Sequence, residues 1–301
     1  MSMIVPDDAM LQHEIEQLAV KAGKMILAAD VSDQRSDAHA KKPGSSEVSV
    51  AQKSSRRDLV TSKDLEIQKM LMKRLSIFVD NCRFLCEEDL TGSDLSLDEL
   101  HGAKLITDPA QVNEGTCFII DPIDGTANFV HGCRHSCTSI AMTVRGETRL
   151  GVIYDPYHNE LFSACKGRGA WLNGRRLPVF DAALADSITV FGTAPYDDTT
   201  NAPTFRLAHL LYELSSDVRR TGSAALDCCW TACGRFGLYA ELGLSPWDFA
   251  AGKLIAEETG CVVTDIHGLP LNFTGRLSIL CGRPTAVKEF LEHYHDDGPS
   301  E

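Results

Sequence analysis

The hydrophobic positions of this 301-residue chain follow two repeats, one typical of helices and one typical of strands. Between residues 11 and 29, apolar side chains such as Leu11 and Ile15 recur every three to four positions, which predicts a helix with one buried face. Thr61 or Ser62 is a suitable N-cap for the next helix. The same reasoning predicts further helices over 203–214, 223–234, 246–259 and 285–293.

Short apolar runs bounded by turn residues predict strands between these helices. Arg145-Gly146 and Asn173-Gly174 are expected hairpin turns. Because strands and helices alternate irregularly and hairpins intervene, the pattern favours α+β layers over a doubly wound parallel sheet. The predicted strands are 83–86, 117–120, 139–144, 150–154, 160–165, 170–172, 188–191, 238–241, 262–264 and 279–281.

Two polar stretches lack a strong hydrophobic period. Residues 31–57 are predicted to form a long loop, and residues 91–115 an irregular surface insertion. We expect one domain over 1–301, with an N-terminal half at about 8–180, a C-terminal half at about 185–295 and a frayed tail at 296–301.

The composition limits which binding partners and which cellular location are expected. A net charge of −13 argues against a nucleic acid held through its phosphates, but not against a small anionic substrate bound with divalent cations. No apolar run approaches the ~20 residues of a membrane span, and no signal peptide is visible. The 11 cysteines include no CxxC pair, which favours reduced thiols and a cytoplasmic protein.

The most informative stretch spans residues 117–132. Its four leading apolar residues predict a strand buried on both faces, which the following proline and glycine should end. Asp121 and Asp124 place two carboxylates beside that strand end, where oxygen ligands suit Mg²⁺, Mn²⁺ or Ca²⁺. The N–H groups of Gly125 and Thr126 could bind an anion. Asp, Pro and Gly also form ordinary turns, so this stretch alone leaves both interpretations open.

Three further acids occupy similar positions. Asp64 falls in the first turn of its predicted helix, Asp248 follows the N-cap Ser245 by three residues, and Glu87 ends a predicted strand. Each has a structural explanation as a helix-start acid or a solvated charge. All of them nevertheless lie at boundaries between strands and helices, and acids gathered from several such ends can form a multi-metal phosphate site.

Five motifs then show a resemblance to the inositol monophosphatase family, within the lithium-sensitive, magnesium-dependent phosphatases. Two long motifs are FIIDPIDGTANF at 118–129 and WDFAAG at 247–252. Three shorter ones are DLVTSKD at 58–64, CEE at 86–88 and GSAA at 222–225. They occur in the family's order, and the likeness covers about 11–293. It implies a layered αβαβα sandwich.

The resemblance also implies a metal site. Glu87, Asp121 and the carbonyl of Ile123 would hold a first Mg²⁺, and Asp121 would bridge to a second ion held also by Asp124 and Asp248. A third, weaker ion would share Glu87 with waters. Mn²⁺ is an alternative ion, and Li⁺ and Ca²⁺ are expected to inhibit.

The remaining implied roles concern water and substrate. Asp64 and Thr126 would orient and deprotonate the attacking water. The N–H groups of Gly125 and Thr126 would bind phosphate, while Ala224 and Glu241 would contact sugar or cyclitol hydroxyls. The implied catalytic residues are thus Asp64, Glu87 and Thr126, and the implied substrate contacts are Asp124, Gly125, Thr126, Ala224, Glu241 and Asp248.

The activity implied is Mg²⁺-dependent hydrolysis of inositol monophosphate or a close polyol phosphate, in a homodimer. Relatives that act on fructose 1,6-bisphosphate, histidinol phosphate or 3′(2′),5′-bisphosphate nucleotides remain alternatives, as does a regulatory protein that keeps the fold and binds partners. The chain departs from the family at Cys86, at Cys133-Arg134 and at Gly237-Leu238, and both polar stretches are long. Lys53, in the first of them, would lie near the metals.

Overall fold

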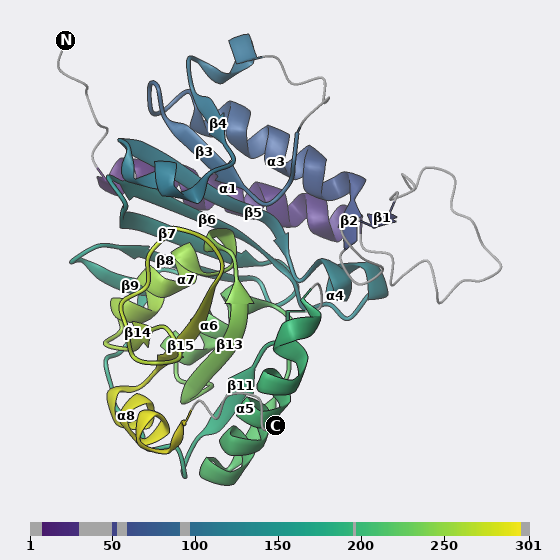
Figure 1. Ribbon diagram of the computed structural model, residues 1–301. Coiled ribbons are helices and arrows are strands. Elements are labelled where there is room, and N and C mark those ends of the chain that lie inside the picture. The colour runs from purple at the N-terminus through teal and green to yellow at the C-terminus, as the bar shows by residue number, and fades with distance from the viewer. Residues whose placement is uncertain (1–7, 30–49, 53–58, 91–96, 195–196, 296–301) are drawn as a thin grey trace.

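Two β-sheets and the helices that cover them stack in five layers in the order αβαβα (Figure 1). The structure, a computed structural model, describes residues 8–29, 50–52, 59–90, 97–194 and 197–295. Successive helical layers contain α1 (Asp8–Ala28) with α3 (Ser62–Leu75), α6 (Ala224–Ala232) with α7 (Pro246–Glu257), and α5 (Asn201–Leu214) with α8 (Pro284–His293). The predicted layered α+β sandwich is confirmed.

The larger sheet has eight strands in the order β10-β9-β8-β7-β6-β5-β3-β4. β3 runs parallel to β4 and β5, whereas the remaining neighbours are antiparallel. Its strands are β3 (Arg83–Cys86), β4 (Lys104–Ile106), β5 (Thr116–Asp124), β6 (Cys137–Val144), β7 (Glu147–Asp155), β8 (Glu160–Cys165), β9 (Gly169–Leu172) and β10 (Arg175–Arg176).

The smaller sheet has five strands in the order β12-β11-β13-β15-β14. They are β11 (Ile188–Phe191), β12 (Asp217–Arg219), β13 (Leu238–Leu244), β14 (Val262–Thr264) and β15 (Leu277–Gly282). Outside both sheets lie the ribbon of β1 (Val50–Gln52) and β2 (Leu59–Thr61), the short helix α4 (Thr126–His131), and 3-10 turns at Leu97–Leu100, Pro109–Asn113 and Asp198–Thr200.

Three hydrophobic clusters hold the layers together. One packs α6 and α7 between the sheets, one packs α1 and α3 on the large sheet, and one packs α5 and α8 on the small sheet. Arg283 adds polar contacts to the layer between the two sheets. Its fully buried guanidinium donates to the carbonyls of Thr231, Ala232 and Thr259. These carbonyls lie at the C-terminal ends of α6 and α7, so one side chain joins both helices.

Three expectations about local structure are wrong. The stretch 31–57 is not wholly a loop, because β1 within it pairs antiparallel with β2. Pro122 and Gly125 do not end the strand at residue 120, because β5 continues to Asp124 with a shift of its register against β6 between Asp121 and Asp124. Proline has no N–H to pair, so it is tolerated at such an irregularity. The stretch 97–115 is not wholly irregular, since β4 within it is the edge strand beside β3. A three-residue strand has too few positions to show a period.

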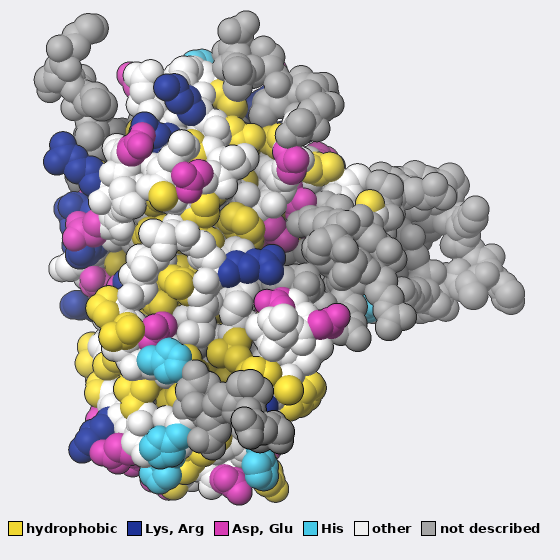
Figure 2. All heavy atoms as spheres, in the orientation of Figure 1, with side chains coloured by type: hydrophobic (Ala, Val, Ile, Leu, Met, Phe, Trp, Pro, Cys, Tyr) yellow, Lys and Arg dark blue, Asp and Glu magenta, His cyan; other side chains and the backbone are white. Residues whose placement is uncertain are grey.

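Some expectations fall outside the described residues, including the loop over 31–49, Lys53, Asp58, residues 91–96 and the tail. Among the described residues, no helix has both the length and the apolar character needed to cross a bilayer. On the face shown in Figure 2, acidic and basic side chains are interspersed, and histidines gather over the lower part, where α5 and α8 lie.

Candidate functional site

Acidic side chains from four elements converge beside the end of β5. They form two groups, in each of which one carboxylate oxygen per residue lies within 4.8 Å of the others. The neighbouring strands bring the groups together, because the N–H of Glu87, just after β3, donates to the carbonyl of Ile120 in β5 at 3.1 Å. One group is Asp64, Glu87 and Glu88, and the other is Asp121, Asp124 and Asp248.

Helix N-termini hold three of these acids. The N–H of Thr61 donates to Oδ2 of Asp64 at 2.9 Å, and Asp64 completes the capping box of α3. The N–H of Ser245 donates to Oδ2 of Asp248 at 2.7 Å at the start of α7. Oδ2 of Asp124 accepts from the hydroxyl of Ser223 and, at 2.9 Å, from the N–H of Ala225, where α6 begins. Asp64 and Asp248 therefore cap their helices, as the sequence predicts, and also belong to the two groups of converging acids.

A turn with unusual backbone geometry joins β5 to α4. Gly125 has φ +85°, and a Cβ there would approach the carbonyl oxygens of His135 and Gly222 at 3.0 and 3.1 Å, so only glycine fits easily. Next to it, the hydroxyl of Thr126 donates to the carbonyl of Ile123 at 3.0 Å and lies 3.5 Å from Oδ1 of Asp64. Thr126 thus connects the acids of α3 to those of β5.

The acids repel one another strongly. Burial, followed by the charges of Glu87, Asp124 and Asp248, raises the pKa of Asp121 well above its ordinary value. Burial also raises the pKa of Asp124 to about 6, although the hydroxyl of Ser223 and the N–H of Ala225 lower it. The pKa of Asp248 is raised by burial and then by Asp124 and Glu87.

A divalent cation would relieve this repulsion. Asp121 is 2% exposed, and its buried Oδ1 has no hydrogen-bond partner among the described residues. Carboxylate oxygens that converge from several elements are the ligands that Mg²⁺ and Mn²⁺ favour, and an unpartnered buried oxygen is costly without such an ion. The donor set and its electrostatics therefore fit one or more hard cations.

Glu241 and Ala224 lie on the C-terminal side of the acids. Ala224 is the first residue of α6, and the hydroxyl of Tyr239 donates to Oε2 of Glu241 at 2.6 Å in β13. Burial raises the pKa of Glu241 to about 7, while Tyr239 lowers it. A Cβ at Gly192 would lie 1.7 Å from Oε2, so Glu241 can occupy this place only beside a glycine.

The structure adds residues that the sequence analysis did not select. Glu88 joins Asp64 and Glu87, because Gln68 of α3 accepts from its N–H at 3.0 Å and donates to its carbonyl at 2.7 Å. Ser223 belongs to the GSAA motif, which was a signal for its role. Asp227, buried in α6, had no signal in the sequence.

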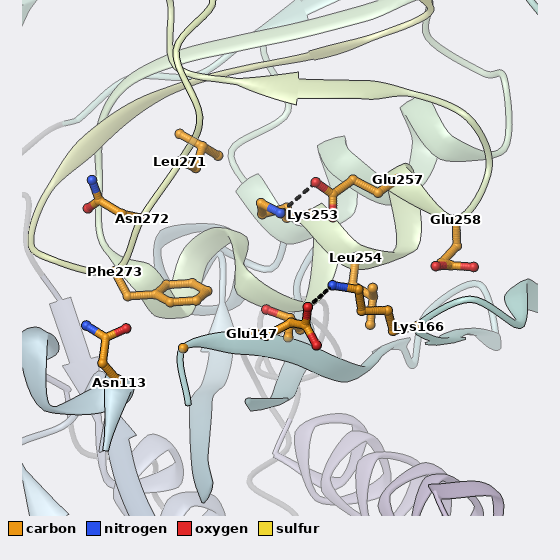
Figure 3. Close-up of a pocket in the computed structure, with 12 residues that line it drawn as sticks. Asn113, Glu147, Lys166, Lys253, Leu254, Glu257, Glu258, Leu271, Asn272 and Phe273 are labelled. Atoms are coloured by element: carbon orange, nitrogen blue, oxygen red, sulfur yellow. Dashed lines mark hydrogen bonds and ion pairs between the residues drawn. The ribbon is translucent and has the colours of Figure 1, made fainter. Parts of the chain in front are cut away.

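A cavity of about 540 Å³ lies at the other end of α7 (Figure 3). Its lining includes Lys253, Glu257 and Phe273. Lys166 pairs there with Glu147, and Lys253 pairs with Glu257 at 2.6 Å. Since these charges satisfy one another, the cavity is a weaker candidate than the acids beside β5.

Known proteins place this fold in a class. A solved IMPase/NADP phosphatase complexed with Mg²⁺ and phosphate has a TM-score of 0.69 and 27% identity, over 84% of this chain and 88% of that one. The chain therefore has the layered fold of inositol monophosphatase structures. The model of the inositol monophosphatase family matches residues 8–296, and the chain belongs to this family.

Two curated relatives differ in their names. Nus factor SuhB of Vibrio cholerae serotype O1 is 43% identical over 187 residues, which cover 61% of this chain and 68% of the relative. Inositol-1-monophosphatase of Bacillus subtilis strain 168 is 34% identical over 248 residues, which cover 82% of this chain and 87% of the relative.

Proposed function

We propose that this protein is a Mg²⁺-dependent phosphomonoesterase that hydrolyses inositol monophosphate or a close polyol phosphate to the alcohol and phosphate. The observation that carries the proposal is the convergence of two acid groups on the turn between β5 and α4. Family membership and the relative named inositol-1-monophosphatase support it.

In this proposal Glu87, Asp121 and the carbonyl of Ile123 hold one Mg²⁺, and Asp121, Asp124 and Asp248 hold a second. A third ion shares Glu87, and Li⁺ or Ca²⁺ inhibits by competing for these positions. When bound, Mg²⁺ supplies the positive charge that neutralises phosphate oxygens and makes a nearby water a better nucleophile.

The protein groups orient and activate the reactants. Oδ1 of Asp64, which lies 3.5 Å from the hydroxyl of Thr126, accepts the proton from water in this proposal. The hydroxyl of Thr126, whose proton goes to the carbonyl of Ile123, lies beside that oxygen and orients the same water. The N–H groups of Gly125 and Thr126 bind phosphate oxygens at the start of α4, and hydrolysis then depends mainly on position and charge.

Substrate choice rests on the C-terminal side of the site. Glu241 and Ala224 contact substrate hydroxyls, and the buried Glu241 accepts or donates a hydrogen bond according to its protonation. Asn128-Phe129, which follows Asp-Gly-Thr at the end of the first motif, favours the inositol branch over the nucleotide branch.

A panel of phosphate esters tests this proposal. Phosphate release would be measured in Mg²⁺, with and without Li⁺, from inositol monophosphate, fructose 1,6-bisphosphate, histidinol phosphate and 3′-phosphoadenosine 5′-phosphate. We expect the highest kcat/KM with inositol monophosphate. A preference for the nucleotide would refute the inositol assignment, and no release from any ester would refute the phosphatase itself.

A second candidate function is a regulatory role through a protein partner, favoured by the similarity to a relative named as a Nus factor. Both roles can coexist on one chain, and a homodimer is our expectation for its oligomeric state. The Asp121→Asn variant separates the roles, because hydrolysis should vanish while partner binding survives. Light scattering of the purified protein tests the dimer.

A further inference from the structure

The turn Thr221–Ser223, just before α6, contacts the first motif from the other half of the chain. The hydroxyl of Ser223 donates to Oδ2 of Asp124, 99 residues away in sequence. The N–H of Ala225 donates to the same oxygen at 2.9 Å. A carboxylate held by two donors on one oxygen cannot rotate freely, so its remaining lone pairs keep one direction.

Asn128 fixes this turn from the side of α4. Its Nδ2 donates to the carbonyls of Thr221 at 2.9 Å, of Gly222 at 3.3 Å and of His135 at 2.8 Å. The turn approaches so closely that a Cβ at Gly222 would lie 3.1 Å from that Nδ2. One buried amide thereby ties together the turn and the segment that follows α4.

Asp227 fixes the turn from the side of α6. The hydroxyl of Thr221 donates to its Oδ1 at 2.6 Å, and its N–H donates to the carbonyl of Ser223 at 3.0 Å. Asp227 is 1% exposed, so water does not compete for the hydrogen bond. The turn is thus held at both ends by buried side chains.

We propose that Asn128 and Asp227 are positioning residues, which hold the turn Thr221–Ser223 so that it orients Asp124 for a divalent cation. The proposal rests on the metal site of the proposed function. Partners behind a metal ligand typically change metal affinity by ~10–100-fold when they are removed. The affinity for Mg²⁺ is therefore the property these residues set.

The test titrates MgCl₂ alone into metal-free protein and follows the midpoint of thermal unfolding. Asn128→Ala, Asp227→Ala and Ser223→Ala should each raise the Mg²⁺ concentration for half-maximal stabilisation by ~10–100-fold. Ser223→Thr keeps the hydroxyl and Asp227→Asn keeps an acceptor for Thr221, so both should restore the wild-type value. Ser163→Ala is the matched control, because Ser163 is buried in β8 and accepts from Gln12.

The proposal would be overturned if Asn128→Ala or Asp227→Ala reached half-maximal stabilisation at the same Mg²⁺ concentration as the wild type. It would also be overturned if Ser223→Thr did not restore the wild-type concentration. If Asn128→Ala does not fold, the comparison of Ser223→Ala with Ser223→Thr and of Asp227→Ala with Asp227→Asn still tests the proposal. The titration needs no substrate, so an absence of hydrolysis with a normal Mg²⁺ response would refute only the proposed function. A wild-type protein without any Mg²⁺ response would overturn both.

Discussion

Asp124→Asn should make the metal-free protein more stable at neutral pH, although it removes a proposed metal ligand. The pKa of Asp124 is raised from 3.8 to about 6 in the folded protein, chiefly by burial. The free energy of unfolding therefore contains a contribution from protonated Asp124. This contribution is fully present below pH 3.8 and is lost as the pH rises through about 6. At ~1.4 kcal/mol per pH unit, the ionised carboxylate costs about 3 kcal/mol at pH 7.5 and about half as much at pH 5.

Asparagine removes this cost and keeps one oxygen to accept from Ser223 and Ala225. The free energy of unfolding, measured by urea denaturation in a chelator, should therefore exceed that of the wild type by about 3 kcal/mol at pH 7.5 and by about half as much at pH 5. Mg²⁺ at 1,000 times its Kd should reverse the order at pH 7.5, because a ligand at that concentration adds about 4.1 kcal/mol to the wild type. Asp217→Asn, at an exposed acid, is the control and should show no gain. An advantage that does not change with pH, or none at pH 7.5, would refute the reasoning.

Asp64→Asn keeps an oxygen for the N-cap of α3 but cannot accept a proton, so turnover should fall by ~10²–10⁴-fold with an unchanged circular dichroism spectrum; near-normal phosphate release would contradict its role as base. The pKa of Glu241 is raised to about 7, so its carboxyl group ionises between pH 6 and 8. The KM for the polyol phosphate should therefore change over that interval. The KM of Glu241→Gln should change less over that interval than the KM of the wild type, and an identical pH profile would contradict the substrate contact. Arg283→Met leaves the carbonyls of Ala232 and Thr259 without the Arg283 donor, while the carbonyl of Thr231 still accepts from the N–H of Gly234, and it should lower the free energy of unfolding in urea by ~2–5 kcal/mol; a loss below ~1 kcal/mol would contradict the role of Arg283 in joining the two helices.

Helix starts were predictable because their causes are local. Thr61 and Asp64 are three residues apart and close a capping box, and Ser245 precedes Pro246 and Asp248 in the same way. Such signals depend on a few neighbouring residues, so they survive in the sequence. By contrast, the passage of β5 through Pro122 and the edge strand β4 depend on pairing with other strands, which no local pattern shows.

The candidate site likewise has features that the sequence predicted and features that only the tertiary structure shows. The sequence by itself determined the layered fold class and the family, and it supplied the acids from short motifs that lie at strand and helix boundaries. Only the tertiary structure decided that Gln68 of α3 holds Glu88 near Asp64, that Gly192 leaves space for Glu241, and that a turn 99 residues away holds Asp124. Capping acts within one helical turn, whereas the meeting of carboxylates follows from the order of strands and the packing of α6 and α7 between two sheets.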